Sequence, residues 1–366
     1  MFAVEDTAAQ ICWTGGGRGE LTFEAGPARR TVELDGLPGA TVLDGLPPAS
    51  ALELTVTGAG AARRGRRLVT PFATLVTPPG RLLCRFATVN DVHIGSRSFG
   101  TLHPVWEDGQ GEPHAVACAR AALDEAGQWG ADLVVVKGDL TQDGCPEEWG
   151  DVAGLIAACG LPAAVVEGNH DVCRQAVDGA AILASHGVRL HQRPAAIDLP
   201  GLRVVLFPTA AWHVDVGTID AAHRSAALDL VANAGGPAVV ALHHYPQRFR
   251  WPTMYPSGIP GPIAGSFLDA LAEANPATMV LTGHSHRHRR HSHGPLVVAE
   301  VGSTKDYPGS WAGYAVHEGG IRQVTRRVSA RPAIAWTEQG RRVLGGVWAV
   351  WAPGLRSHRC FSHTWP

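Results

Sequence analysis

The sequence predicts an α/β protein made of a small N-terminal β-sandwich and a larger layered domain. Short β-prone runs separated by Gly/Pro turns fill the first 80 residues, and apolar strands alternate with alanine-rich helical stretches after them. A length of 366 residues also fits about two domains. We therefore predict a β-sandwich over residues 1–80 and a second domain over residues 81–366, which ends in a β-rich, aromatic extension.

In the first part, regularly spaced short strands with turn residues between them are typical of a β-sandwich. Candidate catalytic residues are almost absent there, so we expect a packing or interaction role. The Thr-Pro-Pro-Gly segment at 77–80 cannot continue a strand ladder and predicts a short linker. The predicted strands are Ala9–Trp13, Arg30–Leu34, Leu52–Thr57 and Leu68–Val76.

In the second part, the alternation of strands and helices predicts a layered α/β domain with a largely buried sheet. The predicted strands are Leu82–Val89, Leu133–Val136, Ala163–Val166, Leu202–Phe207, Val239–Leu242 and Met279–Leu281. The predicted helices are Ala115–Trp129, Glu147–Ala158, Ala221–Val231 and Ile263–Ala274. From Leu296 onward the chain returns to β runs, and we expect the aromatic residues of its tail to lie in the core.

Composition and charge exclude several classes of protein. Hydrophobic residues make up 45% of the chain, which supports a large core and argues against intrinsic disorder. The 31 basic and 33 acidic residues give a net charge of −2, so neither nucleic acid nor an anionic membrane is an expected partner. The apolar stretch Val343–Leu355 is too short to span a bilayer and predicts buried core.

Two further features bear on location and redox state. The first residues are acidic and lack the pattern of a secretory signal, so we expect a cytoplasmic protein. The seven cysteines are scattered and form no C-x-x-C pair, which favours reduced thiols over a disulfide framework or a thiolate zinc site.

Polar residues of a few types follow five of the predicted strands. In α/β sheets, ligands gather at the carboxyl ends of strands, so these residues are candidates for one shared site. Each motif alone is weak, but five strand ends in one domain deliver Asp, Asn and His. The motifs are Asp91-Val92-His93, Gly138-Asp139, Gly168-Asn169-His170-Asp171, His243-His244 and Gly283-His284-Ser285-His286.

This set of residues suits a pair of divalent cations. Two metal ions about 3.5–4 Å apart neutralise a phosphoryl group and generate hydroxide at neutral pH. One carboxylate can bridge them, while imidazoles and an amide oxygen complete their coordination. The absence of thiolates favours Mn, Fe, Co or Zn, and the identity of the metal stays open. In Asp91-x-His93 and His284-x-His286, alternate residues of an extended segment point to one face.

In these motifs the sequence resembles the calcineurin-like metallophosphoesterase superfamily. The family pattern of Asp-x-His, Gly-Asp, Gly-Asn-His-Asp/Glu, His and Gly-His-x-His is present in order, from about residue 85 to about residue 305. The resemblance implies a four-layer metallophosphoesterase α/β sandwich, here preceded by the small N-terminal β-sandwich.

The resemblance also implies a role for each motif residue. Of the adjacent pair, His243 matches the family ligand, and we expect His244 to lie behind it. Asp139 is expected to bridge the metals, His170 to donate a proton to the leaving group, and Asp171 to orient His170. The implied ligands are Asp91, His93 and His286 for the first metal, and Asn169, His243 and His284 for the second.

Departures from the family pattern indicate which branch of the superfamily the sequence resembles most. The second motif continues to Gly144 without the Asp-Arg-Gly ending of protein Ser/Thr phosphatases. Gln142 stands where purple acid phosphatases have a tyrosine ligand. The remaining resemblance is to the bacterial class III cyclic nucleotide phosphodiesterases and glycerophosphodiesterases.

We therefore expect a metal-dependent phosphodiesterase acting on cyclic nucleotides or glycerophosphodiester-like small molecules. In the implied mechanism a metal-bound hydroxide attacks phosphorus in line, and protonated His170 gives its proton to the departing alkoxide. A phosphomonoesterase on the same scaffold is the main alternative, followed by a nuclease and a non-catalytic metal-binding module. Homo-oligomerisation stays open.

Three segments near the motifs carry open interpretations. Residues 287–293 are expected to form a solvated hairpin, with a cationic binding rim as the alternative. The long insertion 245–262, with Trp251 and Tyr255, is a candidate lid over the metals. The loop after the first strand of the second part could line a substrate pocket or simply pack, through Phe99, His103, Trp106 and His114.

Overall fold

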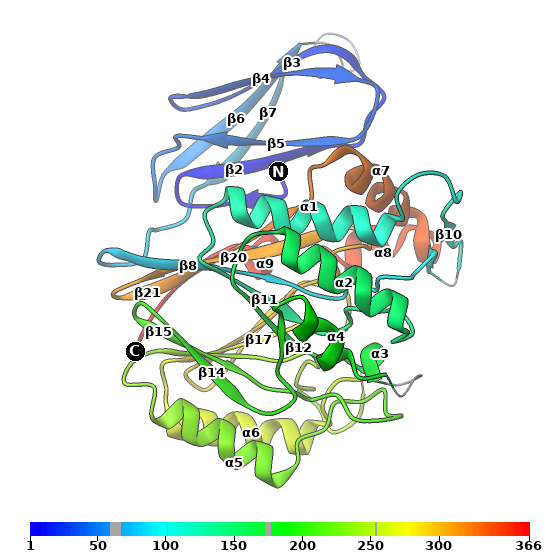
Figure 1. The fold of residues 1–366 in the computed structure, drawn as a ribbon. Helices are drawn as coiled ribbons and strands as arrows, with labels where there is room; N and C mark the ends of the chain where they lie inside the picture. The colour runs from blue at the N-terminus through cyan, green and yellow to red at the C-terminus, as the bar shows by residue number, and fades with distance from the viewer. Residues whose placement is uncertain (59–66, 101, 173–176, 253–254) are drawn as a thin grey trace.

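The computed structural model describes residues 1–58, 67–100, 102–172, 177–252 and 255–366 (Figure 1). Its N-terminal part contains two antiparallel sheets, of strand order β4-β3-β6-β7 and β1-β2-β5. Phe23, Leu43 and Leu54 belong to one buried cluster between them. These strands are β1 (Ala3–Val4), β2 (Ala8–Trp13), β3 (Arg18–Ala25), β4 (Ala28–Asp35), β5 (Gly39–Asp44), β6 (Ala51–Gly58) and β7 (Leu68–Ala73).

The N-terminal β-sandwich that we predicted is therefore confirmed, with three strands, β1, β3 and β5, that the sequence did not reveal. β3 carries charged residues between its apolar ones, and β5 is short and begins at a glycine. β3 buries only alternate side chains, and β5 buries only Gly39 and Leu43, so the apolar content of both strands is too low to distinguish them from turns.

The larger part contains two mixed sheets. The seven-stranded sheet has the order β13-β12-β11-β8-β20-β21-β22, and the six-stranded sheet has the order β14-β15-β16-β17-β19-β18. The first consists of β8 (Leu82–Val89), β11 (Leu133–Lys137), β12 (Ala163–Val166), β13 (Arg189–Leu190), β20 (Ser310–His317), β21 (Gly320–Arg327) and β22 (Phe361–Thr364). The second consists of β14 (Ala195–Leu199), β15 (Leu202–Leu206), β16 (Ala238–Ala241), β17 (Thr278–Thr282), β18 (Arg289–His293) and β19 (Leu296–Glu300).

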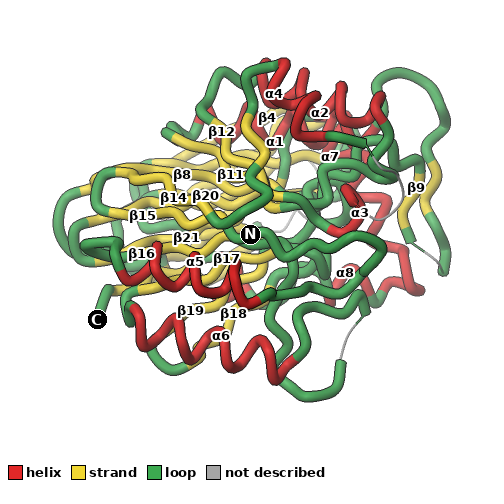
Figure 2. Tube along the Cα trace, turned by 60° about the horizontal axis from the view of Figure 1, so that its bottom comes forward, coloured by secondary structure: helices red, strands yellow, loops and turns green. Residues whose placement is uncertain are grey.

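These two sheets pack face to face and are covered by helices on their outer faces. Phe86, Val135 and Leu281 come from both sheets and share one buried cluster. Helices α1 (His114–Gln128) and α2 (Pro146–Ala158) cover the seven-stranded sheet. Helices α5 (Ala221–Ala232) and α6 (Gly261–Ala274) cover the six-stranded sheet, as Figures 1 and 2 show. The helix-sheet-sheet-helix arrangement confirms the predicted four-layer α/β sandwich.

The C-terminal extension differs from the expectation of β runs and buried core. After β21 the chain forms short helices before it returns as β22: α7 (Arg331–Gln339), a 3₁₀ segment (Gly340–Gly346), α8 (Trp348–Trp351) and α9 (Arg356–Arg359). Within the apolar stretch, Val343 and Trp348 are buried, but Val350 is 80% exposed and Leu355 is also exposed. The prediction of buried core was wrong for this half of the stretch, because a short helix on the surface buries only one of its faces.

The N-terminal part packs on the seven-stranded sheet through buried contacts. Phe2 belongs to one apolar cluster with Val324 and Cys360. Asp6 pairs with the buried guanidinium of Arg322. Whether residues 1–80 fold independently stays a prediction, as does the domain boundary at residue 80. The six described cysteines are free thiols, and Cys173 lies outside the described residues.

Candidate metal centre

Parallel pairing brings the five polar motifs to one end of the sandwich. In the seven-stranded sheet, β8, β11 and β12 are parallel neighbours, so the motifs at Asp91, Asp139 and Asn169 follow adjacent strand ends. In the six-stranded sheet, β16 and β17 are parallel neighbours, and His243 and His284 follow their ends. Each sheet therefore contributes side chains to the same region.

The backbone at these strand ends adopts an unusual conformation. Five of the motif residues have positive φ angles, in the left-handed region that non-glycine residues rarely occupy. Such conformations persist where the surrounding structure enforces them, and they are common at functional sites. The angles are 52° at Asp91, 48° at His93, 50° at Asp139, 76° at His284 and 55° at His286.

The first group of donor atoms comes from Asp91, His93, Asp139 and His286, all within 4.8 Å of one another. The Nε2 atoms of His93 and His286 lie 3.2 Å apart. His286 Nε2 is 3.7 Å from Asp91 Oδ1, and His93 Nε2 is 3.5 Å from Asp139 Oδ2. Two imidazoles and two carboxylates thus converge on one point.

The second group surrounds Nε2 of His243, which is fully buried. This atom lies 3.2 Å from Asn169 Oδ1, 3.1 Å from His284 Nδ1 and 3.3 Å from Asp139 Oδ1. His244 lies beside this group, but its Nδ1 contacts the Thr209 hydroxyl at 2.9 Å. His243, His244 and His284 nevertheless each offer a donor atom within 4.8 Å of the others, so the choice of His243 over His244 stays a prediction.

Asp139 lies between the two groups. Its Oδ2 faces His93 in the first group, and its Oδ1 faces His243 in the second. Oδ1 also accepts a hydrogen bond from the backbone N–H of His170, at 3.0 Å. The two oxygens of one carboxylate thus face different groups of donors.

The hydrogen bonds of the histidines fix which ring nitrogen faces each group. His243 Nδ1–H donates to the Lys137 carbonyl at 2.9 Å, and His284 Nε2–H donates to the Ser257 carbonyl at 3.2 Å. His286 Nδ1–H donates to Asp306 Oδ2 at 2.6 Å. Each ring therefore presents its other nitrogen to the donor groups, as metal-binding histidines do. The described residues fit a pair of first-row metal ions.

Burial and neighbouring charges shift the ionisation of these groups. Burial alone would raise the pKa of Asp139, but His243 and His93 hold this pKa well below its ordinary value. Burial opposes a charge on His243, yet Asp139 raises the pKa of this imidazole to about 9. Burial and the neighbouring His243 lower the pKa of His284 to about 3.

His170 and Asp171 lie on α3 (Asn169–Val172), directly beside these groups. The His170 ring is 4.5 Å from the His93 ring, and its Nδ1 is 2.8 Å from the Gln142 carbonyl. Asp171 instead accepts hydrogen bonds from the backbone N–H of Thr141 and Gly168, both at 2.8 Å. The Gln142 carbonyl holds the His170 ring, and Asp171 holds the neighbouring residue Thr141, so the prediction that Asp171 orients His170 stays a prediction of an indirect role.

Sequence reasoning missed Lys305 and Asp306, which follow β19. Asp306 is buried and accepts from His286 Nδ1, while its Oδ1 pairs with the Lys305 ammonium at 2.7 Å. The hydroxyl of Ser303, two residues before Lys305, donates to the Asp91 carbonyl at 2.7 Å. These residues belong to no family motif, so the only available signal was their place at another strand end.

Two glycines allow the strand-end loops to approach this closely. A Cβ on Gly138, which has a φ of +79°, would lie 2.6 Å from the His243 ring. A Cβ on Gly168 would collide with the Asp139 carboxylate and backbone. Both motifs therefore need glycine for steric reasons at this site.

The loop after β8 and residues 287–293 only partly agree with the structure that we predicted for them. Phe99 packs 5.5 Å from Trp348, and His114 stacks 3.7 Å from Trp336, so both belong to the packed structure. Residues 289–293 form the expected hairpin with β19. The start of segment 287–293 is not solvated, as we had expected, because Arg287 is buried against Trp351, with 3.8 Å from the guanidinium to the ring centroid.

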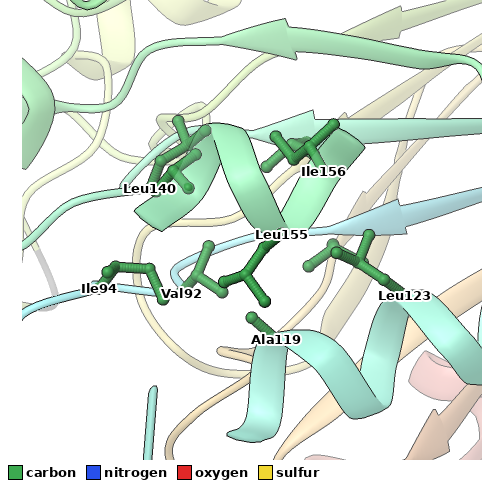
Figure 3. A pocket seen from close by; sticks show the side chains of 10 residues that line it. Val92, Ile94, Ala119, Leu123, Leu140, Leu155 and Ile156 are labelled. Carbon is green, nitrogen blue, oxygen red and sulfur yellow. The ribbon is translucent and has the colours of Figure 1, made fainter. Parts of the chain in front are cut away.

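A small cavity between α1, α2 and the seven-stranded sheet is unrelated to this centre (Figure 3). Its lining is apolar and includes Val92, Leu123 and Ile156. The cavity holds about 20 Å³, which leaves room for no more than about one water molecule. It is a packing defect of the core rather than a substrate site.

The chain belongs to the calcineurin-like phosphoesterase family, whose model matches residues 84–288. This match confirms the resemblance that the motifs indicated. Members of this family are metallophosphoesterases, which work with two-metal sites. None of the described helices is long and apolar enough to cross a bilayer.

Three curated relatives share low identity with the chain. A probable cyclic nucleotide phosphodiesterase of Synechococcus is 25% identical over 46% of this chain and 63% of its own length. A probable cyclic nucleotide phosphodiesterase of Psychrobacter arcticus is 23% identical over 64% of this chain and 84% of its own length. The 3',5'-cyclic adenosine monophosphate phosphodiesterase of Pseudomonas aeruginosa is 27% identical over 47% of this chain and 61% of its own length. The chain thus spans less than two thirds of two of these relatives.

Proposed function

We propose that the protein hydrolyses phosphodiesters with two bound metal ions. The observation that carries this proposal is the position of Asp139, whose two oxygens face two separate groups of donors. In this proposal Asp139 bridges the ions. Asp91, His93 and His286 hold the first ion, and Asn169, His243 and His284 hold the second.

When bound, the two ions supply charge neutralisation and an activated water for attack on phosphorus. The chain itself supplies the proton for the leaving group. His170 keeps one ring N–H on the Gln142 carbonyl, so in its protonated form the other ring nitrogen carries a transferable proton. Asp171 acts indirectly, because it holds the loops of Thr141 and Gly168 together.

The proposed substrates are small-molecule phosphodiesters, either cyclic nucleotides or glycerophosphodiesters. The names of the three relatives support this class, and so does Gln142, which stands where purple acid phosphatases place a tyrosine ligand. The ligand set accommodates Mn, Fe, Zn or Co, and the identity of the metal stays open. The same scaffold would serve a phosphomonoesterase, and the assay below separates the two.

The test compares hydrolysis of bis(p-nitrophenyl) phosphate and p-nitrophenyl phosphate by metal-stripped protein, with and without added Mn²⁺. We expect Mn²⁺ to restore activity, with the diester preferred. The Asp139→Asn variant should lose both metals, measured by elemental analysis, and therefore all activity. Preference for the monoester would favour the phosphomonoesterase, and retention of two metals by Asp139→Asn would refute the bridging role.

A further inference from the structure

Lysine is rare in this chain and occurs only beside the metal centre. Of the 31 basic residues, 29 are arginines and two are lysines, Lys137 and Lys305. Both lysines are buried. Lys137 lies two residues before Asp139, and Lys305 directly precedes Asp306. Both therefore lie in the surroundings of the donor groups, where an ammonium is a more compact cation than a guanidinium.

Lys137 connects the two sheets. Its Nζ donates to the Thr282 carbonyl at the end of β17, at 2.6 Å, and its own carbonyl accepts from His243 Nδ1 at 2.9 Å. Burial lowers the pKa of Lys137 to about 7. Its side chain lies on a neutral carbonyl, whereas Lys305 forms an ion pair with a carboxylate.

Lys305 is linked to the first donor group by two contacts in series. Its ammonium lies 2.7 Å from Asp306 Oδ1, and Asp306 Oδ2 accepts from His286 Nδ1–H at 2.6 Å. The other ring nitrogen of His286 lies 3.7 Å from Asp91 Oδ1, inside the donor group. Burial alone would raise the pKa of Asp306, but Lys305 and His286 hold this pKa below its ordinary value. The charge of Lys305 therefore acts on His286 through one ionised carboxylate.

The surrounding structure holds Lys305 in this place. Its carbonyl accepts from Trp336 Nε1 at 2.9 Å, and its backbone N–H donates to the Ser303 hydroxyl at 3.2 Å. The ammonium lies 5.4 Å from the centre of the Phe99 ring. Because Lys305 and Asp306 are both buried, salt and water screen their interaction little.

The charges near the first donor group bear on the charge of its ion. A carboxylate that accepts from a metal-binding histidine makes this histidine a stronger donor, which favours a more highly charged ion. Here the ammonium of Lys305 compensates the charge of Asp306. Gln142, which stands where purple acid phosphatases have a tyrosine ligand, adds no anionic ligand either.

We propose that Lys305 is a positioning residue that favours a divalent over a trivalent ion at the first metal position. It acts through Asp306 and His286, by cancelling the carboxylate charge that would otherwise stabilise a trivalent ion. The proposal rests on the proposed function, because it concerns the ion that Asp91, His93 and His286 would hold. It implies that this chain works with two divalent ions rather than with a trivalent–divalent pair.

The experiment measures the midpoint potential of the full chain loaded with excess iron, by a redox titration followed by electron paramagnetic resonance. Iron is the probe because its two oxidation states report the relative affinity for a trivalent and a divalent ion. The variants are Lys305→Met, Asp306→Asn and the double variant. The matched control is Arg81→Met, which removes an exposed cation from its pair with Glu318, at the other end of β8 from Asp91.

In Lys305→Met, trivalent iron should gain about tenfold in affinity relative to divalent iron, which lowers the midpoint potential by about 59 mV. Asp306→Asn should shift the potential in the opposite direction, because it removes a negative charge. The double variant restores a neutral pair and should return close to the wild type. The control should match the wild type.

Equal potentials in the iron-loaded wild type and Lys305→Met would overturn the proposal. Shifts of the same sign in Lys305→Met and Asp306→Asn would also overturn it, because a loss of packing does not depend on the sign of the charge. If Lys305→Met does not fold, equal potentials in the wild type and Asp306→Asn would be decisive against it. Failure of the wild type to bind iron would overturn the proposal together with the proposed function, whereas the expected shifts without any hydrolysis would overturn the proposed function alone.

Discussion

At the scale of single residues, the metal centre separates side chains that face the donor groups from side chains that hold them. His170 faces the site but is not surrounded by other donor atoms in the way that His243 is. The distinction can be measured, because removal of a ligand lowers metal content, whereas removal of a proton donor lowers activity and leaves the metals bound.

His170→Ala should retain two metal ions and lose activity by about two to four orders of magnitude, the usual contribution of a general acid. The loss should be larger for substrates with poor leaving groups, since those need the proton most. The measurements are metal content and kcat for a series of aryl phosphodiesters. Loss of a metal ion from this variant would mean that His170 is a ligand.

Asp306→Asn tests a side chain that holds a candidate ligand. The substitution weakens the acceptor of His286 Nδ1–H and removes the charge partner of Lys305, so one metal ion should bind about 10–100-fold more weakly. The measurement is a metal titration followed by calorimetry. Asp269→Asn is the matched control, because Asp269 accepts from His293 at 2.7 Å on the surface. Equal affinities in both variants and the wild type would contradict the positioning role.

At the scale of elements, the strand ends are the features that the sequence revealed best. The motifs predicted a shared site because β8, β11 and β12 are parallel and their carboxyl ends meet at one edge. The glycines in these motifs are steric requirements, and this gives a test that leaves every donor atom in place.

Gly168→Ala should abolish or strongly weaken metal binding, because the new Cβ would collide with the Asp139 carboxylate. Gly154→Ala, on α2, is the control, since its Cβ meets nothing within 4 Å. This control should keep full metal content and gain a little stability from the better helix propensity of alanine. The checks are metal content and thermal unfolding. Full metal content in Gly168→Ala would show that the loop can move aside.

The elements that the sequence failed to predict have a common physical cause. In Val343–Leu355 apolar residues occur on all sides of a short helical segment, so the run indicates hydrophobicity but not which face is buried. Lys305 and Asp306 act through a contact between β17 and β19 that depends on the three-dimensional register. Segment 245–262 was recognised as an insertion, but its contact with His284 is made by the backbone carbonyl of Ser257, which no residue type reveals.

At the scale of the whole molecule, buried charges connect the N-terminal part to the seven-stranded sheet. Asp6 and Glu5 both face the buried Arg322. Asp6→Asn leaves part of this guanidinium charge uncompensated, so it should lower the free energy of unfolding by about 3 kcal/mol. Asp35→Asn removes the partner of Arg331 on the surface between the same two parts and should change little. Urea denaturation checks both, and equal stabilities would show that the buried pair contributes nothing.

Metal removal should also change the stability of the whole molecule. Asp91, His93, Asp139 and Asn169 come from the seven-stranded sheet, and His243, His284 and His286 come from the six-stranded sheet. Ions that bind only the folded state stabilise it by about 2.7 kcal/mol at a hundred times their Kd. We therefore expect the Tm to rise with Mn²⁺ concentration and to fall on addition of a chelator. A Tm that is independent of metal would contradict two-metal binding at this site.

Because the donor atoms come from two sheets, the thickness of the core between these sheets affects the geometry of the metal centre. Because the ligands of one metal centre come from two sheets, the distance between the sheets sets the distance between the ligands. Phe86 and Tyr314 are cross-strand neighbours in the seven-stranded sheet, and both side chains lie in the buried cluster between the two sheets, where their volume would affect the distance between them. Changes in side-chain volume in that layer would therefore change metal affinity without any change of ligand. Related chains with the same ligands could differ in metal preference because their core residues differ.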